Sequence, residues 1–307
     1  MKASIHDYLK PGLVHFMAYP ATMGGDGPCL ETISEVVADE FFDCIEITKV
    51  NDPDEAEKVR QVLGSSGLEV GFAAQPIALR GGLNLNSFDE EERRKAIDAL
   101  KDAVDRAYFF GAGKLGFISG KKPAERQDEA LQLLADSIIE IGRYAKSKGN
   151  LVLSLETFDD DTEKKAIIGT NRLAVELSRV VRKHIPDFGL MLDLSHIPMQ
   201  GETIREALTV AAEHINHAHI GTCVISDLND PLYGDKHPRF LHPKSECRTP
   251  EVRAFLAGLL DIGYLREDAP ERNIVSFEVQ PAAGSHETPQ SVVAEAKRVL
   301  REAWRTL

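Results

Sequence analysis

Residues 151–156 read Leu-Val-Leu-Ser-Leu-Glu, an apolar run that is too short for a helix and ends in a carboxylate. Residues 274–278 (Ile-Val-Ser-Phe-Glu) repeat this form, and residues 189–193 (Gly-Leu-Met-Leu-Asp) end on an aspartate in the same way. Short runs rich in Val, Ile, Leu and Phe are typical of buried strands. The three stretches therefore predict strands that each place an acid at the carboxyl end.

Short apolar runs of this kind recur along the chain, and longer amphipathic stretches separate them. The eight runs are residues 12–18, 42–47, 68–73, 114–119, 151–156, 188–193, 217–220 and 274–278. The helical patterns include residues 89–110, 126–148, 171–184 and 250–262. Because strands that alternate with helices pair in parallel, an α/β fold is expected. No GxGxxG follows the first run, so we predict a (β/α)₈ TIM barrel that forms a single domain over residues 1–307.

Local signals mark where helices begin and end. Ser87-Phe-Asp-Glu90 has the form of a capping box, and Thr249-Pro250 and Thr288-Pro289 each place a cap residue before a proline. Helix stops are expected at Gly111, Gly149 and Gly263. Two long loops, 81–88 and 222–248, follow the third and seventh runs, where a barrel builds its active site.

Composition and net charge indicate which partners and which cellular compartment to expect. The chain has 307 residues and a net charge of −13, which argues against nucleic acid or an anionic membrane as a partner. Its four cysteines lack CxxC spacing, which favours a reducing compartment. The first residues lack the apolar core of a signal peptide, and no run approaches 18 apolar residues. We therefore expect a cytoplasmic protein.

Four predicted strands end in a potential metal ligand: Glu156, Asp193, His219 and Glu278. If these strands are neighbours in a barrel, their ligands converge above one rim. Three carboxylates and one imidazole suit Mn²⁺, which is the expected ion, with Mg²⁺, Co²⁺ or Zn²⁺ as alternatives. A buried acid cluster without a cation would be costly, because like charges repel. The alternative interpretation treats each acid separately, as a helix cap or a surface charge.

These stretches resemble the xylose isomerase-like barrel superfamily, which includes sugar isomerases and epimerases, dehydratases and apurinic-site endonucleases. The similarity rests on residues 103–120, 151–161, 189–196 (GLMLDLSH), 217–221 (HAHIG) and 274–278. The resemblance implies a single catalytic metal held by Glu156, Asp193, His219 and Glu278. In the epimerase branch, the resemblance further implies that the two glutamates act as an acid–base pair on opposite faces of the substrate.

A second group of polar residues allows two interpretations. His196 follows Asp193 by three residues, where the superfamily has a histidine that touches substrate oxygens or a further metal. Asp235 and His237 lie in the loop 222–248 and could hold a second metal with His196, as in the endonucleases, or bind sugar hydroxyls. The endonucleases also use histidines from the third and fourth strands. Here those strand ends carry Gln75 and Ser119, so DNA repair is not expected.

Several further residues have more than one possible role. His15 could contact substrate or lie in the core, and His217 is expected one layer below His219. Glu46 and Lys49 could line the pocket or pair with one another. Arg239 is a candidate for holding a negatively charged substrate group.

The leading functional prediction is a metal-dependent sugar isomerase or epimerase that acts through an enediolate on a keto-sugar or related polyol. The same intermediate could instead expel a β-substituent, which would make the enzyme a lyase or dehydratase, for example on a 3-keto-glycoside. A non-catalytic sugar-binding barrel and an endonuclease-like hydrolase are further alternatives. The expected partner is a small sugar, with homo- or hetero-oligomers both open.

Overall fold

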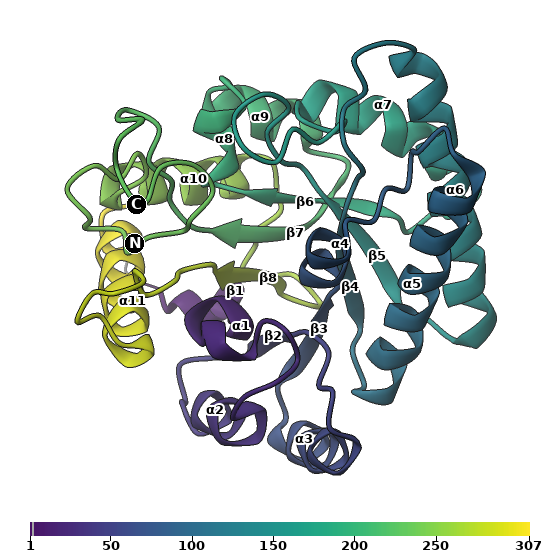
Figure 1. Cartoon of the computed structure of the whole chain (residues 1–307). Coiled ribbons are helices and arrows are strands. Elements are labelled where there is room, and N and C mark those ends of the chain that lie inside the picture. Colours follow the sequence, from purple (N-terminus) through teal and green to yellow (C-terminus); the bar gives the residue numbers. More distant parts are fainter. Residues whose placement is uncertain (2) are drawn as a thin grey trace.

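The computed structural model describes residue 1 and residues 3–307. Eight parallel strands close into one barrel in sequence order, which confirms the predicted fold (Figure 1). The strands are β1 (Leu9–Val14), β2 (Cys44–Ile47), β3 (Glu69–Ala73), β4 (Lys114–Ile118), β5 (Val152–Glu156), β6 (Gly189–Asp193), β7 (Ile215–Ile220) and β8 (Asn273–Phe277).

A ring of helices covers the outside of the barrel (Figure 1). These helices are α2 (Cys29–Val37), α3 (Pro53–Ser66), α5 (Glu90–Phe109), α6 (Gln127–Lys148), α7 (Asn171–Val181), α9 (Ile204–Ala211), α10 (Thr249–Asp261) and α11 (Pro289–Arg305). Shorter elements are η1 (Ile5–Asp7), α1 (His15–Ala18), η2 (Pro20–Thr22), α4 (Gln75–Gly81) and α8 (His196–Met199). Of these, α1, α4 and α8 each begin just after a strand and therefore lie at the carboxyl rim.

The first predicted strand, residues 12–18, was wrong in its position. Residues 9–14 form β1, and residues 15–18 form the helical turn α1 instead. Leu9 of β1 pairs with Asn273 of β8, so the strand begins before the apolar run does. An apolar run of this length fits a strand or a buried helical turn equally well, and periodicity does not separate them.

Two helix starts also differ from the prediction. Asp89, rather than Ser87, caps α5, and its carboxylate accepts the backbone N–H groups of Glu91 and Glu92 at 2.8 and 3.0 Å. Arg248, rather than Thr249, occupies the cap position of α10. Aspartate is as good a cap as serine and lies next to the helical residues, so the helix starts there.

The remaining helix signals are confirmed. Thr288 caps α11 and its hydroxyl accepts the Ser291 N–H at 3.1 Å. Gly111 and Gly263 follow helix ends with positive φ of 74° and 75°, and Gly149 ends α6. These glycines stop each helix where the chain must turn back into the next strand.

A β-bulge in β7 sets the register of the polar residues in this strand. Leu190 of β6 pairs with Ile215, whereas the next residue, Met191, pairs with His217, so Asn216 is an extra residue. Asn216 accepts a hydrogen bond from the Ser154 hydroxyl at 2.8 Å. The bulge therefore ties β7 to β5 and sets the register of the two histidines that follow.

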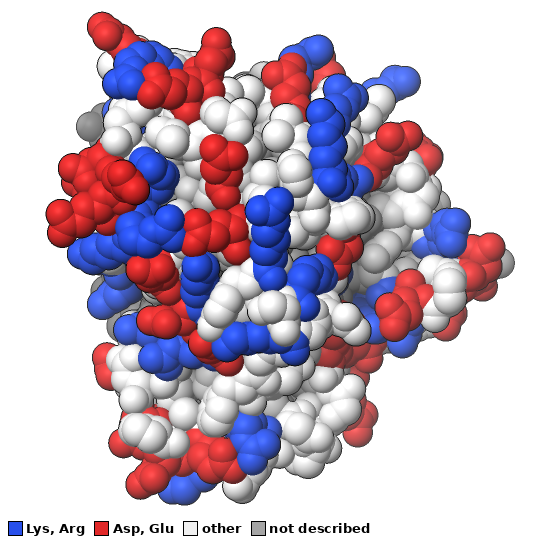
Figure 2. Space-filling model, turned by 90° about the vertical axis from the view of Figure 1, so that its right-hand side faces the viewer, with Lys and Arg blue, Asp and Glu red and all other residues white. Residues whose placement is uncertain are grey.

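The surface and the remaining core are ordinary for an α/β protein. All four cysteines are buried and unpaired. No helix in the described part of the chain combines the length and apolar character needed to cross a bilayer. On the face that carries α5 and α6, basic side chains lie among acidic ones (Figure 2). Glu140 of α6, for example, pairs with Arg94 and Lys101 of α5.

Candidate active site

Four buried side chains meet at the carboxyl ends of neighbouring strands. Glu156 ends β5, Asp193 ends β6, His219 lies in β7 and Glu278 follows β8 directly. One ligand atom from each of them lies within 4.8 Å of every other. The predicted ligand set is thus brought together, although its role as a metal site stays a prediction.

Each of these ligands except Glu278 has one atom held by the protein and one facing the cluster. Gln75 Nε2 donates to Glu156 Oε2 at 2.8 Å, and the Ser195 backbone N–H donates to Asp193 Oδ1 at 2.7 Å. The second oxygens, Glu156 Oε1 and Asp193 Oδ2, are buried and have no hydrogen-bond partner among the described residues. Buried polar atoms normally have partners, so this arrangement fits a divalent cation at their centre.

The electrostatics of the cluster point the same way. Burial raises the pKa of Glu278 to about 7, helped by the nearby Glu156 and opposed by His237. Burial alone would lower the pKa of His219, but the carboxylates of Glu46 and Glu278 hold it well above its ordinary value. Acids crowded in this way repel one another, and a bound dication would relieve that repulsion.

A second polar group adjoins the cluster and centres on Asp235. Its Oδ1 lies 3.1 Å from His196 Nε2 and 2.7 Å from His237 Nε2, and its Oδ2 lies 2.9 Å from Lys164 Nζ. His196 Nδ1 also faces the Thr157 carbonyl oxygen at 2.8 Å. Both nitrogens of His196 therefore donate, which requires a charged ring. Although burial opposes it, Asp235 raises the pKa of His196 to about 10.

His237 connects the two groups. Its Nδ1 is buried without a hydrogen-bond partner among the described residues and lies 3.7 Å from Asp193 Oδ2. Its backbone φ is 45°, a left-handed conformation that a residue other than glycine rarely adopts. Strained backbone of this kind concentrates at functional sites, and here it directs the imidazole toward the acid cluster.

A cavity of about 280 Å³ opens above the acid cluster. Its floor includes Glu156, His219 and Glu278, and polar side chains of the second group line one side. The rest of the lining includes an apolar wall of Phe16, Met17, Met23, Pro76 and Leu79, next to which Arg80 also lines the cavity. Helix α4, which supplies Pro76 and Leu79, begins just after β3 and is drawn in front of the strands in Figure 1.

Three predicted substrate-binding residues do not line this cavity. His196 is 1% exposed, and both of its ring nitrogens already bond to protein oxygens. His15 is buried behind it, where Nε2 lies 2.8 Å from the Thr32 hydroxyl. Arg239 forms ion pairs with Glu287 and Glu295 at 2.9 and 3.1 Å. The structure therefore places His15 in the core, and the two acids already neutralise Arg239.

Three residues near the ligands were not identified as their partners from the sequence. Glu46 accepts from His219, Gln75 donates to Glu156, and Lys164 neutralises Asp235. Glu46 and Gln75 both lie at strand ends, which is a signal that they face the rim. Lys164 lies in a loop after β5 and gave no such signal.

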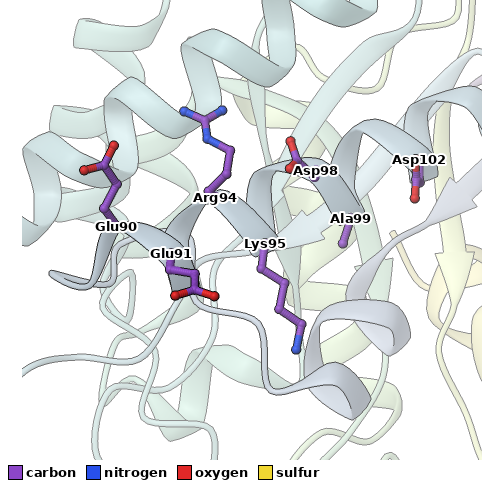
Figure 3. A pocket seen from close by; sticks show the side chains of 7 residues that line it. All are labelled: Glu90, Glu91, Arg94, Lys95, Asp98, Ala99 and Asp102. Atoms are coloured by element: carbon purple, nitrogen blue, oxygen red, sulfur yellow. The ribbon is translucent and has the colours of Figure 1, made fainter.

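A broader hollow of about 800 Å³ lies on the outside of the barrel and has a different character. Residues of α5 alone line it, and Figure 3 shows Arg94 and Lys95 pointing away from one another. Its lining contains no histidine or cysteine among the described residues. This hollow is a surface groove beside one helix, so the chemistry of the molecule concentrates at the barrel mouth.

A family model described as "Xylose isomerase-like TIM barrel" matches residues 35–303. The chain belongs to the xylose isomerase-like TIM barrel family. A search of the curated proteins gave no match.

Solved structures similar to this xylose isomerase-like barrel include sugar epimerases. D-psicose 3-epimerase from Clostridium cellulolyticum H10, crystallised with D-tagatose, shares 17% identity with a TM-score of 0.67, over 97% of this chain and 98% of that one. The 3-keto-D-glucoside 4-epimerase of E. coli shares 15% identity with a TM-score of 0.65, over 97% and 100%. The IOLI protein, solved with a zinc atom, shares 18% identity with a TM-score of 0.72, over 96% and 98%. At these identities the likeness establishes the fold.

Proposed function

We propose that this xylose isomerase-like barrel is a divalent metal-dependent sugar epimerase or isomerase. The observation that carries the proposal is the pair of buried glutamates, Glu156 and Glu278, which share one cluster at the floor of the cavity. A protein that only binds sugar has little need for two buried bases beside one another. The epimerases among the structural neighbours support the same class of reaction.

Glu156, Asp193, His219 and Glu278 would hold the cation, with Mn²⁺ as the expected ion. When bound, this ion would polarise the substrate carbonyl and make the adjacent C–H more acidic. The unpartnered oxygens of Glu156 and Asp193 supply the donors that such an ion prefers.

The two glutamates would move the proton. Gln75 fixes the Glu156 carboxylate through Oε2, so its orientation toward the substrate is set before binding. Glu278 would stay ionised beside the cation and could accept the substrate proton or return it. Return of the proton to the opposite face of the same carbon gives an epimer, and return to the neighbouring carbon gives an isomer.

Asp235 and His237 of the second polar group line the cavity and would bind sugar hydroxyls. The rings of His196 and His237 and the ammonium group of Lys164 all surround the Asp235 carboxylate, so this carboxylate has no free oxygen for a second cation. Both nitrogens of His196 donate as well. These contacts argue against a second metal site, whereas His237 Nδ1, which has no partner among the described residues, is left to bind a substrate oxygen.

Solvent exchange tests the proposal directly. The protein is loaded with Mn²⁺, incubated in D₂O with a panel of keto-sugars, and then freed of Mn²⁺ before the products are analysed by NMR. Deuterium should enter the carbon next to the carbonyl. Glu156→Gln and Glu278→Gln should each slow this exchange at least 100-fold, whereas Glu140→Gln, the same change on the outer helix α6, should leave it unaltered. Exchange at the wild-type rate in both active-site variants would exclude the proposal.

A second candidate, β-elimination, is favoured by the apolar wall. Phe16, Met17, Met23, Pro76 and Leu79 face a cavity whose floor is charged. A free sugar has little apolar surface for such a wall, whereas a keto-glycoside carries a substituent that could pack there. His237 in the loop after β7 could then protonate the leaving group. The same NMR experiment with a 3-keto-glycoside would show release of that substituent rather than exchange alone.

A further inference from the structure

We propose that Glu46 is a positioning residue, which holds the imidazole of His219 so that its Nδ1 atom faces the metal centre. This role rests on the proposed function, because it presupposes that His219 is a metal ligand. Glu46 comes from the end of β2, on a different part of the barrel from the four strands that supply the ligands.

The two nitrogens of the His219 ring face two different groups of acids. Nε2 lies 3.1 Å from each oxygen of Glu46. Nδ1 lies 2.7 Å from Glu278 Oε2 and 3.7 Å from Glu156 Oε1. A carboxylate that accepts the Nε2–H fixes the tautomer of the ring and leaves the Nδ1 lone pair for a cation.

Glu46 is built firmly into this position. It is 3% exposed, and a second histidine, His217, lies with Nε2 at 2.8 Å from Glu46 Oε1. The two histidines are two residues apart on β7 and therefore share one face of the strand. A Cβ on Gly71 of β3 would lie 2.9 Å from Glu46 Cγ, so the glycine provides the space that the side chain occupies.

The alternative that Glu46, His217 and His219 form a metal site of their own conflicts with the main cluster. These three residues also have ligand atoms within 4.8 Å of one another. A neutral imidazole has only one lone pair, because the other nitrogen carries the proton. His219 can therefore serve one of the two sites, and the cluster of three acids offers the cation far more negative charge.

Two variants separate positioning from charge. Glu46→Gln removes the charge and keeps the shape, and Glu46→Asp keeps the charge but withdraws the carboxylate by one methylene. Isothermal titration with Mn²⁺ should show that each variant binds the ion roughly 10- to 100-fold more weakly than the wild type. Glu69 lies on β3, the strand next to β2, and its carboxylate pairs with Lys10 of β1. Glu69→Gln should therefore bind Mn²⁺ as the wild type does. Circular dichroism of the metal-free proteins checks folding.

A spectroscopic measurement does not depend on the Glu46 variants. In wild-type protein labelled with ¹⁵N-histidine and loaded with Zn²⁺, the His219 signal should show a protonated Nε2 and a metal-bound Nδ1. His219→Asn assigns the signal by its loss. A protonated Nδ1, or Glu46→Asp with wild-type affinity, would overturn the positioning role alone. A wild-type protein that binds neither ion would overturn the proposed function together with it.

Discussion

His15 is a buried imidazole that takes no part in the acid cluster. It starts α1, stacks on Tyr19 and faces the Thr32 hydroxyl. Because the Thr32 hydroxyl donates to the Pro28 carbonyl oxygen, it accepts the His15 Nε2–H, and the ring stays neutral. Burial lowers the pKa of His15 to about 3, well below the value of an exposed histidine.

This pKa shift predicts how stability depends on pH. Since protons bind His15 more tightly in the unfolded chain, its contribution is complete above about pH 6.5 and is lost as the pH falls toward 3. Between pH 7 and pH 5 the wild type should lose about 2 kcal/mol through this residue. Urea unfolding in EDTA measures that loss, and His15→Gln should abolish this part of it. An equal loss in the variant would show that other groups cause it.

At the scale of single strands and helices, the interior of the barrel is crowded at its glycines. A Cβ on Gly12 of β1 would lie 2.2 Å from Ser276 Oγ and 3.3 Å from Cys44 Cβ. The neighbouring strands β8 and β2 therefore fill the space where a larger residue would point. Gly64 of α3 is different, because it is exposed and nothing lies within 4 Å of its Cβ position.

The two glycines should respond to alanine with opposite signs. Gly12→Ala should destabilise the protein by roughly 1–3 kcal/mol, because a packed interior cannot accept the methyl group without displacing its neighbours. Gly64→Ala should stabilise it by about 0.5–1 kcal/mol, because alanine favours the helix. Denaturant unfolding of both variants provides the measurement. A stable Gly12→Ala would mean that Ser276 moves aside at little cost.

Individual elements also show where prediction from the sequence succeeds and where it fails. Ligands such as Glu156 lie at the ends of strands that can be recognised in the sequence, and neighbouring parallel strands bring those ends together. The partners of the ligands could not be predicted, because Glu46 and His219 are 173 residues apart and meet only across the closed barrel. Residues 15–18 were assigned to a strand because a short apolar run has the same composition in either structure.

At the scale of the whole molecule, the four candidate ligands come from the ends of four adjacent strands of the closed barrel. A cation held by all of them would connect β5, β6, β7 and β8. Binding to the folded state alone stabilises a protein by an amount that grows with ligand concentration. The stability of the barrel should therefore depend on the metal.

Thermal unfolding tests this dependence. Mn²⁺ at about 100 times its dissociation constant should stabilise the protein by about 2.7 kcal/mol and raise its Tm by roughly 5 °C, and EDTA should reverse the change. Asp193→Asn, which neutralises a ligand that is 1% exposed, should respond far less. A shift of the same size in this variant would place the ion elsewhere in the molecule.

The two halves of the chain contribute different parts of the candidate metal centre. The ligands all come from β5 onward, whereas Glu46 and Gln75, which hold two of them in place, come from the end of β2 and from α4. If the four ligands alone were transferred to another barrel, the same side chains would be present, but Glu156 and His219 would not be held in the same orientation. An engineer who wanted the same chemistry would have to graft these two supports as well.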